Sequence, residues 1–184
     1  MRRTQHLAAL FVALSLLPVS ARAQTQAPTV GEIVALVAGS PQLRIDDTLF
    51  SSTSDSKTHP YVNIRNGPEG TIGGYLVPEG ARTGTLSDGT YVLAVPLDSG
   101  GSGGIFTQIV FARRGTSAPA YVGYIESAGH LAVGVEGGVI VATRPYYGDD
   151  SPNCCPKKYV VQTYTVRDGQ LEKLSERFEP ARAE

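Results

Sequence analysis

Residues Thr90 to Pro96 (TYVLAVP) form an almost unbroken apolar run in the middle of the chain. A strand with one solvent-exposed face alternates apolar and polar residues, whereas a strand that is buried on both faces is apolar throughout. Asp88-Gly89, a pair typical of hairpin turns, comes directly before the run. The run therefore predicts a strand with packed side chains on both of its faces.

Short segments rich in β-branched and aromatic residues flank this run and are separated by turns that contain glycine. The predicted strands are 43–50, 61–65, 74–78, 90–96, 105–112, 120–126, 130–135, 139–144, 158–166 and 170–174. Consecutive strands with short connections usually pair, and no helix-sized segment separates strands after residue 60, which excludes a parallel sheet. The fold class predicted is mainly β, an antiparallel meander or sandwich-like sheet with at most one short N-terminal helix.

Local patterns give finer predictions. Thr29-Val30-Gly31-Glu32 has the spacing of a capping box and favours a helix over 30–38, with an edge strand as the alternative. In 120–126 strict alternation places Tyr121, Gly123 and Ile125 on one face and Val122, Tyr124 and Glu126 on the other. The polar segment 51–59 is predicted to be an exposed loop.

The first 23 residues read as a signal peptide. Arg2 and Arg3 precede an apolar run at 7–19, and Ala21-Arg22-Ala23 is typical of a cleavage site, so we expect cleavage after Ala23. A flexible leader at 24–28, a single β-rich domain at 29–175 and a frayed tail at 176–184 follow. Export places the protein in a secreted or periplasmic compartment, which is oxidising.

Charge and hydropathy argue against nucleic acid as a partner and against a transmembrane segment in the mature chain. Cleavage removes three arginines and no acidic residue, which lowers the formal net charge from −1 to −4. An acidic chain has little to attract a polyphosphate, so nucleic acid is not expected as a partner. The mature chain has no apolar stretch long enough for a transmembrane segment.

Cys154 and Cys155 are the only cysteines, and they are adjacent. Adjacent Cα atoms lie about 3.8 Å apart across a trans peptide, whereas an ordinary disulfide spans about 4.4–6.8 Å. In an oxidising compartment the pair forms a vicinal disulfide, links other chains or stays as thiols. We favour a vicinal disulfide that fixes the loop between two strands, with a thiol-redox role as the alternative.

Two other groups of residues are candidate sites. The loop Gly100-Gly101-Ser102-Gly103-Gly104 fits the nucleophile pattern G-x-S-x-G, but a strand is predicted after it where a nucleophile elbow has a helix. Tyr146 and Tyr147, with Asp149, Asp150 and Asn153, form the favoured binding surface, because aromatic residues are enriched at interfaces. The acidic residues lack the spacing of a calcium loop, so no metal site and no cofactor are predicted.

The region from Thr90 to Leu174 resembles an uncharacterised family of bacterial secreted proteins and lipoproteins. The matching segments are the loop 98–104, the strand 139–144, the stretch 150–156 with its Pro-x-Cys-Cys-Pro, and the closing residues 164–171. The resemblance implies a β-rich domain outside the cytoplasm, with no assigned activity. This chain differs from many members because it lacks the cysteine to which a lipid is attached.

The sequence thus favours a non-catalytic binding or cell-envelope accessory module whose partner is unknown, possible partners being a cell-envelope protein or a glycan. The alternative is an enzyme, either a thiol-redox protein through Cys154 and Cys155 or a hydrolase through Ser102. No catalytic residues are predicted, because no nucleophile, base and orienting group can be assembled from the sequence.

Overall fold

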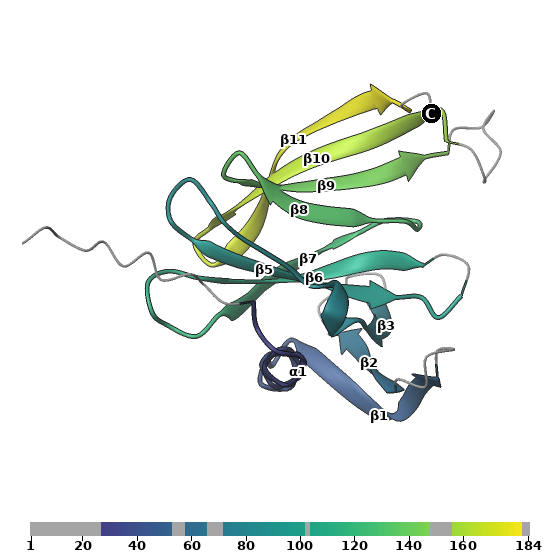
Figure 1. The fold of residues 1–184 in the computed structure, drawn as a ribbon, viewed down its shortest axis with the longest axis vertical. Helices are drawn as coiled ribbons and strands as arrows, with labels where there is room; N and C mark the ends of the chain where they lie inside the picture. Colours follow the sequence, from purple (N-terminus) through teal and green to yellow (C-terminus); the bar gives the residue numbers. More distant parts are fainter. Residues whose placement is uncertain (1–26, 53–57, 66–71, 102–103, 148–155, 182–184) are drawn as a thin grey trace, which may run out of the picture.

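The computed structural model describes residues 27–52, 58–65, 72–101, 104–147 and 156–181, with the backbone alone described at 47–52 and 58. The described chain is mainly β, as the sequence predicts. It contains two antiparallel sheets and one short α-helix (Figure 1). In the ranges described, no helix has the length and apolar character needed to cross a bilayer.

Helix α1 (Val30–Ala38) forms because its first turn carries a complete capping box. The Thr29 hydroxyl accepts a hydrogen bond from the Glu32 N–H at 3.3 Å, and the Glu32 carboxylate accepts one from the Thr29 N–H at 2.7 Å. Ile33 and Val37 are fully buried on one side of the helix. The helix is therefore confirmed, and the edge-strand alternative is wrong.

Sheet A has seven strands in the order β1-β2-β3-β5-β6-β7, with β4 paired to β5 outside this path. The strands are β1 (Leu43–Ser52), β2 (Thr58–Ile64), β3 (Ile72–Leu76), β4 (Arg82–Thr85), β5 (Tyr91–Asp98), β6 (Ile105–Arg113) and β7 (Ala120–Glu126). β4 pairs with the first half of β5, and β3 pairs with its last two residues. The short 3-10 helix η1 (Pro78–Gly80) lies between β3 and β4 in the chain.

Sheet B is a four-stranded meander in the order β11-β10-β9-β8. Its strands are β8 (Ala132–Glu136), β9 (Val139–Tyr146), β10 (Lys158–Arg167) and β11 (Gln170–Pro180). The predicted hairpin joins β8 to β9 through Gly137 and Gly138, which have φ angles of 55° and 79°. Glycine suits this turn because positive φ is strained for other residues.

Strand β5 is buried on both faces, as its apolar sequence predicts. Its alternate residues enter two separate cores, and those of β6 do the same. The helix-side core combines α1 with one face of sheet A and includes Ile33, Val37, Leu93, Val95, Ile109 and Phe111. The inter-sheet core lies between the sheets and includes Val92, Ala94, Val110, Val133, Ile140 and Ala142. Figure 1 shows sheet B over one face of sheet A and α1 beneath the other.

The two sheets approach closely at both edges because glycine lies at each contact. β4 runs beside β8, where a Cβ added to Gly84 would lie 2.4 Å from the Cβ of Val135. β7 runs beside β11, where a Cβ on Gly123 would lie 3.0 Å from the Cβ of Leu171. A larger residue at Gly84 would therefore force the sheets apart.

Strand β4 was not predicted from the sequence, and three further differences concern β11, His59 and β7. β11 continues to Pro180, so residues 176–180 pair with β10 where the sequence predicted a frayed tail. Its charged residues gave no strand pattern because most of them are exposed in an edge strand. His59, predicted to lie in an exposed loop, is buried in β2, where its Nδ1 lies 2.8 Å from the Leu76 carbonyl oxygen.

The third difference is a β-bulge in β7. The register with β6 shifts between the pairs Val110–Gly123 and Phe111–Tyr121. Because a bulge adds one residue, it breaks the alternation of faces. Tyr121 and Tyr124 therefore both pack against the helix-side core, and Val122 and Ile125 both enter the inter-sheet core.

Candidate ligand-binding site

Arg113, the last residue of β6, is the most unusual charged residue of the described chain. Its guanidinium lies over the ring of Tyr91, its partner across the β5–β6 ladder, with 4.7 Å between the guanidinium carbon and the ring centroid. Its Nε is buried and has no hydrogen-bond partner among the described residues. A buried donor without an acceptor is destabilising, so this nitrogen is a candidate for binding something else.

A pocket of about 680 Å³ opens beside Arg113, between α1 and the helix-facing side of sheet A. We call it the α1 pocket. Its lining comes from α1 and the segments that flank it, from β5 and from the β6–β7 connection, and consists of Pro28, Glu32, Ala35, Leu36, Gly39, Ser40, Pro41, Gln42, Tyr91, Leu93, Arg113, Pro119, Ala120 and Tyr121. The volume lies within the range of about 300–1,000 Å³ that is common for small-molecule sites.

Near neutral pH the tyrosines of the α1 pocket stay protonated and its Glu32 carboxyl group stays ionised. Burial raises the pKa of Tyr121 to about 12, with a smaller contribution from Tyr124. Burial also raises the pKa of Tyr91, although the nearby Arg113 opposes this change. Hydrogen bonds from Thr29 lower the pKa of the Glu32 carboxyl group. The pocket thus presents two neutral phenols, one cation, and one carboxylate that already accepts hydrogen bonds.

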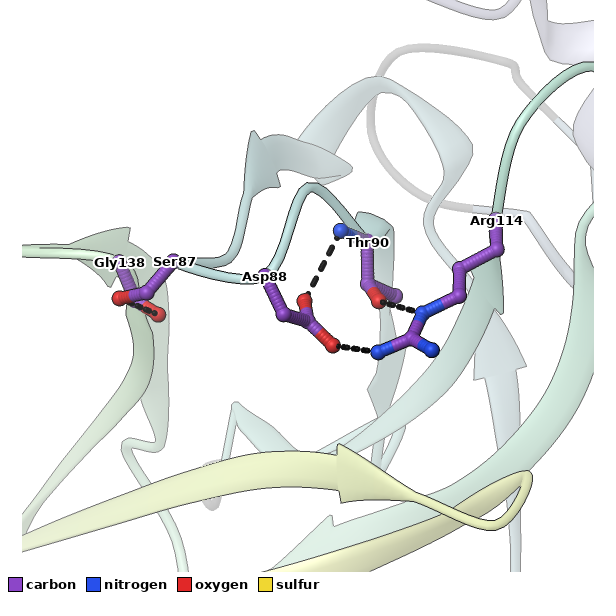
Figure 2. A network of polar contacts seen from close by, with 5 residues as sticks. All are labelled: Ser87, Asp88, Thr90, Arg114 and Gly138. Carbon is purple, nitrogen blue, oxygen red and sulfur yellow. Dashed lines mark hydrogen bonds and ion pairs between the residues drawn. The ribbon is translucent and has the colours of Figure 1, made fainter.

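A second pocket, of about 580 Å³, lies at the end of the inter-sheet core where several turns meet. We call it the inter-sheet pocket. Arg114 is held here by two partners: it donates to the Asp88 carboxylate, and its Nε donates to the Thr90 hydroxyl at 3.3 Å (Figure 2). Asp88 also accepts a hydrogen bond from the Thr90 N–H at 3.0 Å. Mainly because of the bond from Arg114, the pKa of Asp88 falls from 3.8 to about 2.

The same turn connects the two sheets directly. The hydroxyl of Ser87 donates to the carbonyl oxygen of Gly138 at 3.2 Å (Figure 2). The N–H of Ser87 donates to the same oxygen at 2.9 Å. The polar groups around Asp88 therefore satisfy one another and join β4–β5 to β8–β9. Arg113 and Ala120 contribute to the lining of both pockets. The inter-sheet pocket is thus better explained as a structural junction than as a ligand site.

A third hollow, of about 510 Å³, lies between β7 and sheet B. Its Gln162 donates to Glu176 at 2.7 Å and accepts a hydrogen bond from the Tyr164 hydroxyl at 2.8 Å. Lys173 also donates to Glu176, at 3.1 Å. These bonds, of which the one from Gln162 has the largest effect, lower the pKa of Glu176, and burial raises that of Tyr164. These side chains are largely occupied with one another, which makes this hollow a weaker candidate.

The residues that the sequence favoured as a binding surface lie elsewhere. Tyr146 ends β9 and is 41% exposed, and its ring meets that of Phe178 edge to face at 5.1 Å. Tyr147 is partly buried. Asp149, Asp150, Asn153, Cys154 and Cys155 lie outside the described residues. The vicinal disulfide and the acidic part of that surface therefore stay predictions.

Ser102 also lies outside the described residues, but the elements around its loop are described. β5 and β6 pair on either side of it as an antiparallel hairpin, so a strand follows the loop where a nucleophile elbow has a helix. His130 is exposed just before β8. The buried His59 has an acidic neighbour, since its Nε2 lies 3.8 Å from a Glu79 carboxylate oxygen. Sequence spacing did not indicate this pair.

Within the described ranges, no group of three or more histidine, cysteine or acidic residues gathers in a way that could hold a metal ion. Comparison of the chain with protein-family models, with curated proteins and with solved structures finds no match. The resemblance to a family of bacterial secreted proteins stays a prediction.

The sequence did not indicate the α1 pocket, although it contained one useful signal. The predicted strand 105–112 stops one residue short of Arg113. Arg113 nevertheless continues the alternation of Ile109 and Phe111, so a cation follows two apolar residues on the same face of β6. Its position opposite Tyr91 follows from the β5–β6 register. The rest of the pocket depends on where α1 packs, which no local pattern specifies.

Proposed function

We propose that this protein is an exported, non-catalytic binding module that holds a small, largely apolar ligand in the α1 pocket. The observation that carries the proposal is a pocket of about 680 Å³ with aromatic and aliphatic walls and one buried, unpartnered donor, the Nε of Arg113. Ligand sites typically combine such walls with a few polar groups that fix orientation.

Binding suits these side chains better than catalysis does. The phenols of Tyr91 and Tyr121 remain protonated near neutral pH because burial raises their pKa, so they are poor nucleophiles and poor bases. Glu32 has a lowered pKa and is occupied by Thr29, which weakens it as a general base. What these groups offer to a ligand is shape, aromatic surface and hydrogen-bond donors.

Export is the second part of the proposal and is supported by the sequence of the first 23 residues. The expected result is that protein recovered from the periplasm or the medium of a producing bacterium begins at Gln24. N-terminal sequencing measures this directly. Recovery of the chain only from the cytoplasm, with its first residues intact, would contradict export without bearing on the pocket.

Calorimetric titration with cinnamate and with cinnamamide, its neutral counterpart, tests ligand binding. We expect saturable binding of at least one of them at a single site. Ala35→Phe should abolish it, because Ala35 is an exposed residue of α1 that lines the pocket and a phenyl ring there would fill the space. Ala38→Phe is the matched control, since Ala38 is an exposed α1 residue that does not line the pocket.

The proposal fails if neither compound binds saturably to the folded protein. It also fails if Ala35→Phe binds both compounds as tightly as the unchanged protein does, because the site would then lie elsewhere. Circular dichroism of each variant shows whether the fold is retained.

A further inference from the structure

Arg113 differs from its neighbour Arg114, and from several exposed arginines, in having no carboxylate partner among the described residues. Arg114 has Asp88 within ion-pair distance, and exposed pairs join Arg167 to Glu172 and Arg177 to Glu179. No described carboxylate lies within ion-pair distance of Arg113, although it is partly buried. A partly buried cation without a counter-ion has lost part of its hydration and gained no carboxylate in exchange.

The stacking on Tyr91 prepares this guanidinium for a planar anion. A guanidinium that stacks on an aromatic ring presents its flat face to the ring, whereas its N–H donors point outward in its plane. Arg113 lies over the ring of Tyr91, and the Nε on its edge is buried and has no partner among the described residues. A carboxylate matches that edge because its two oxygens can accept parallel hydrogen bonds.

The other walls indicate the rest of the ligand. Leu36, Leu93 and Tyr121 offer apolar or aromatic surface. Glu32 lines the same pocket and is ionised at neutral pH, and hydrogen bonds from Thr29 lower the pKa of its carboxyl group further. Its negative charge disfavours a ligand with two or more negative charges, such as a phosphate ester, more than it disfavours a single carboxylate. The pocket therefore fits one negative charge on an apolar body.

We propose that the ligand of the α1 pocket is a small monocarboxylic acid with an aromatic or otherwise apolar body, whose carboxylate binds the edge of the Arg113 guanidinium. This inference rests on the proposed function and adds the class of ligand to it. Arg113 is a specificity-determining residue in this account, and Tyr91 is the residue that orients it.

The test compares the affinities for cinnamate and cinnamamide in three proteins by calorimetric titration. The unchanged protein should bind cinnamate more tightly than cinnamamide by about tenfold or more, as expected for hydrogen bonds to a charged group. Arg113→Gln should reduce the preference to about twofold or less while cinnamamide still binds. Arg114→Gln is the matched control, because Arg114 does not line the α1 pocket, and it should keep the preference.

Arg113→Lys provides a second variant in case the glutamine variant does not fold. It keeps the positive charge but loses the planar edge and the Nε, so it should retain only part of the preference. If both compounds bind with equal affinity to the unchanged protein and to the Arg113 variants, the inference is overturned while the proposed function stands. If neither compound binds, the proposed function itself fails.

Discussion

Arg113 and Arg114 are neighbours in the chain, yet the two faces of sheet A use them differently. On the inter-sheet side, Arg114 bonds to Asp88 and Thr90 within a network that fixes the turns of the two sheets. Arg113 lines the α1 pocket and also borders the inter-sheet pocket; it lies over the Tyr91 ring, and its buried Nε has no partner among the described residues. The contrast suggests that one face of the sheet is committed to stability and the other retains space and an unused donor for a ligand.

Packing shows the same difference. The inter-sheet core includes Val92, Val110 and Ile140, each with no exposed surface. On the other face, the helix-side core is equally buried at its centre, but near Arg113 it opens into the α1 pocket. Substitutions on the two sides of sheet A should therefore change stability by different amounts.

The largest expected effect comes from shortening a side chain of the inter-sheet core. Ile140→Ala should lower the free energy of unfolding by about 2–5 kcal/mol, because a fully buried isoleucine would leave a cavity. Leu36→Ala in the wall of the α1 pocket should lower it by only about 1 kcal/mol, because Leu36 is already partly exposed. Urea unfolding of both variants measures the difference, and equal losses would show that the two sides are packed alike.

Substitutions of two glycines should have smaller effects on the free energy of unfolding, and the two effects should have opposite signs. Gly84→Ala should destabilise the protein by about 1–3 kcal/mol, because its Cβ would lie 2.4 Å from that of Val135 and would separate β4 from β8. Gly31→Ala in α1 should stabilise it by about 0.5–1 kcal/mol, because nothing lies within 4 Å of the new Cβ and alanine favours a helix. Thermal unfolding measures both changes. A neutral Gly84→Ala would contradict the close approach of the sheets.

The smallest expected effect concerns Asp88 and appears only in acid. Its pKa is lower in the folded protein than its ordinary value of 3.8, falling to about 2. Its charged form therefore stabilises the fold above pH 3.8, and this contribution is lost as the pH falls towards about 2. Asp88→Asn lacks the contribution, so the stability gap between the two proteins should narrow between about pH 5 and pH 2. A gap that stays constant in urea unfolding over this range would show that the Asp88 charge contributes no net stability.

Local patterns were sufficient to predict much of the fold. The two-sided burial of β5 followed from its apolar run, and the helix at 30–38 followed from the Thr29–Glu32 capping spacing. The bounds of β7 were predicted correctly. These features depend on interactions within a few residues, or on a hydrophobic pattern that reports burial directly.

Other features depend on contacts that local patterns do not contain. The second half of β11, residues 175–180, is rich in charged residues and is a strand because β10 pairs with it. The bulge at Gly123 reverses the faces assigned to Tyr124 and Ile125, and only the register with β6 reveals it. The α1 pocket brings Leu36 of α1 close to Tyr91 and Arg113, which are far away in the sequence. Of the two described residues of the surface favoured from the sequence, Tyr146 is exposed and Tyr147 is partly buried. Phe178, the ring partner of Tyr146, lies in the segment that was predicted to be frayed.

The central claim is that the α1 side of sheet A holds a ligand through Arg113. An NMR spectrum that correlates the nitrogen and proton of each arginine Nε–H group tests this claim most directly. On titration of the full mature protein with cinnamate, the signal of Arg113 should move progressively and saturate, because a carboxylate becomes the partner of its Nε–H or of the adjacent edge. The signal of Arg114 should stay in place, because Thr90 and Asp88 already hold that side chain. A signal of Arg113 that does not move at saturating cinnamate, or one of Arg114 that moves more, would contradict the assignment of a ligand site to the α1 side of sheet A.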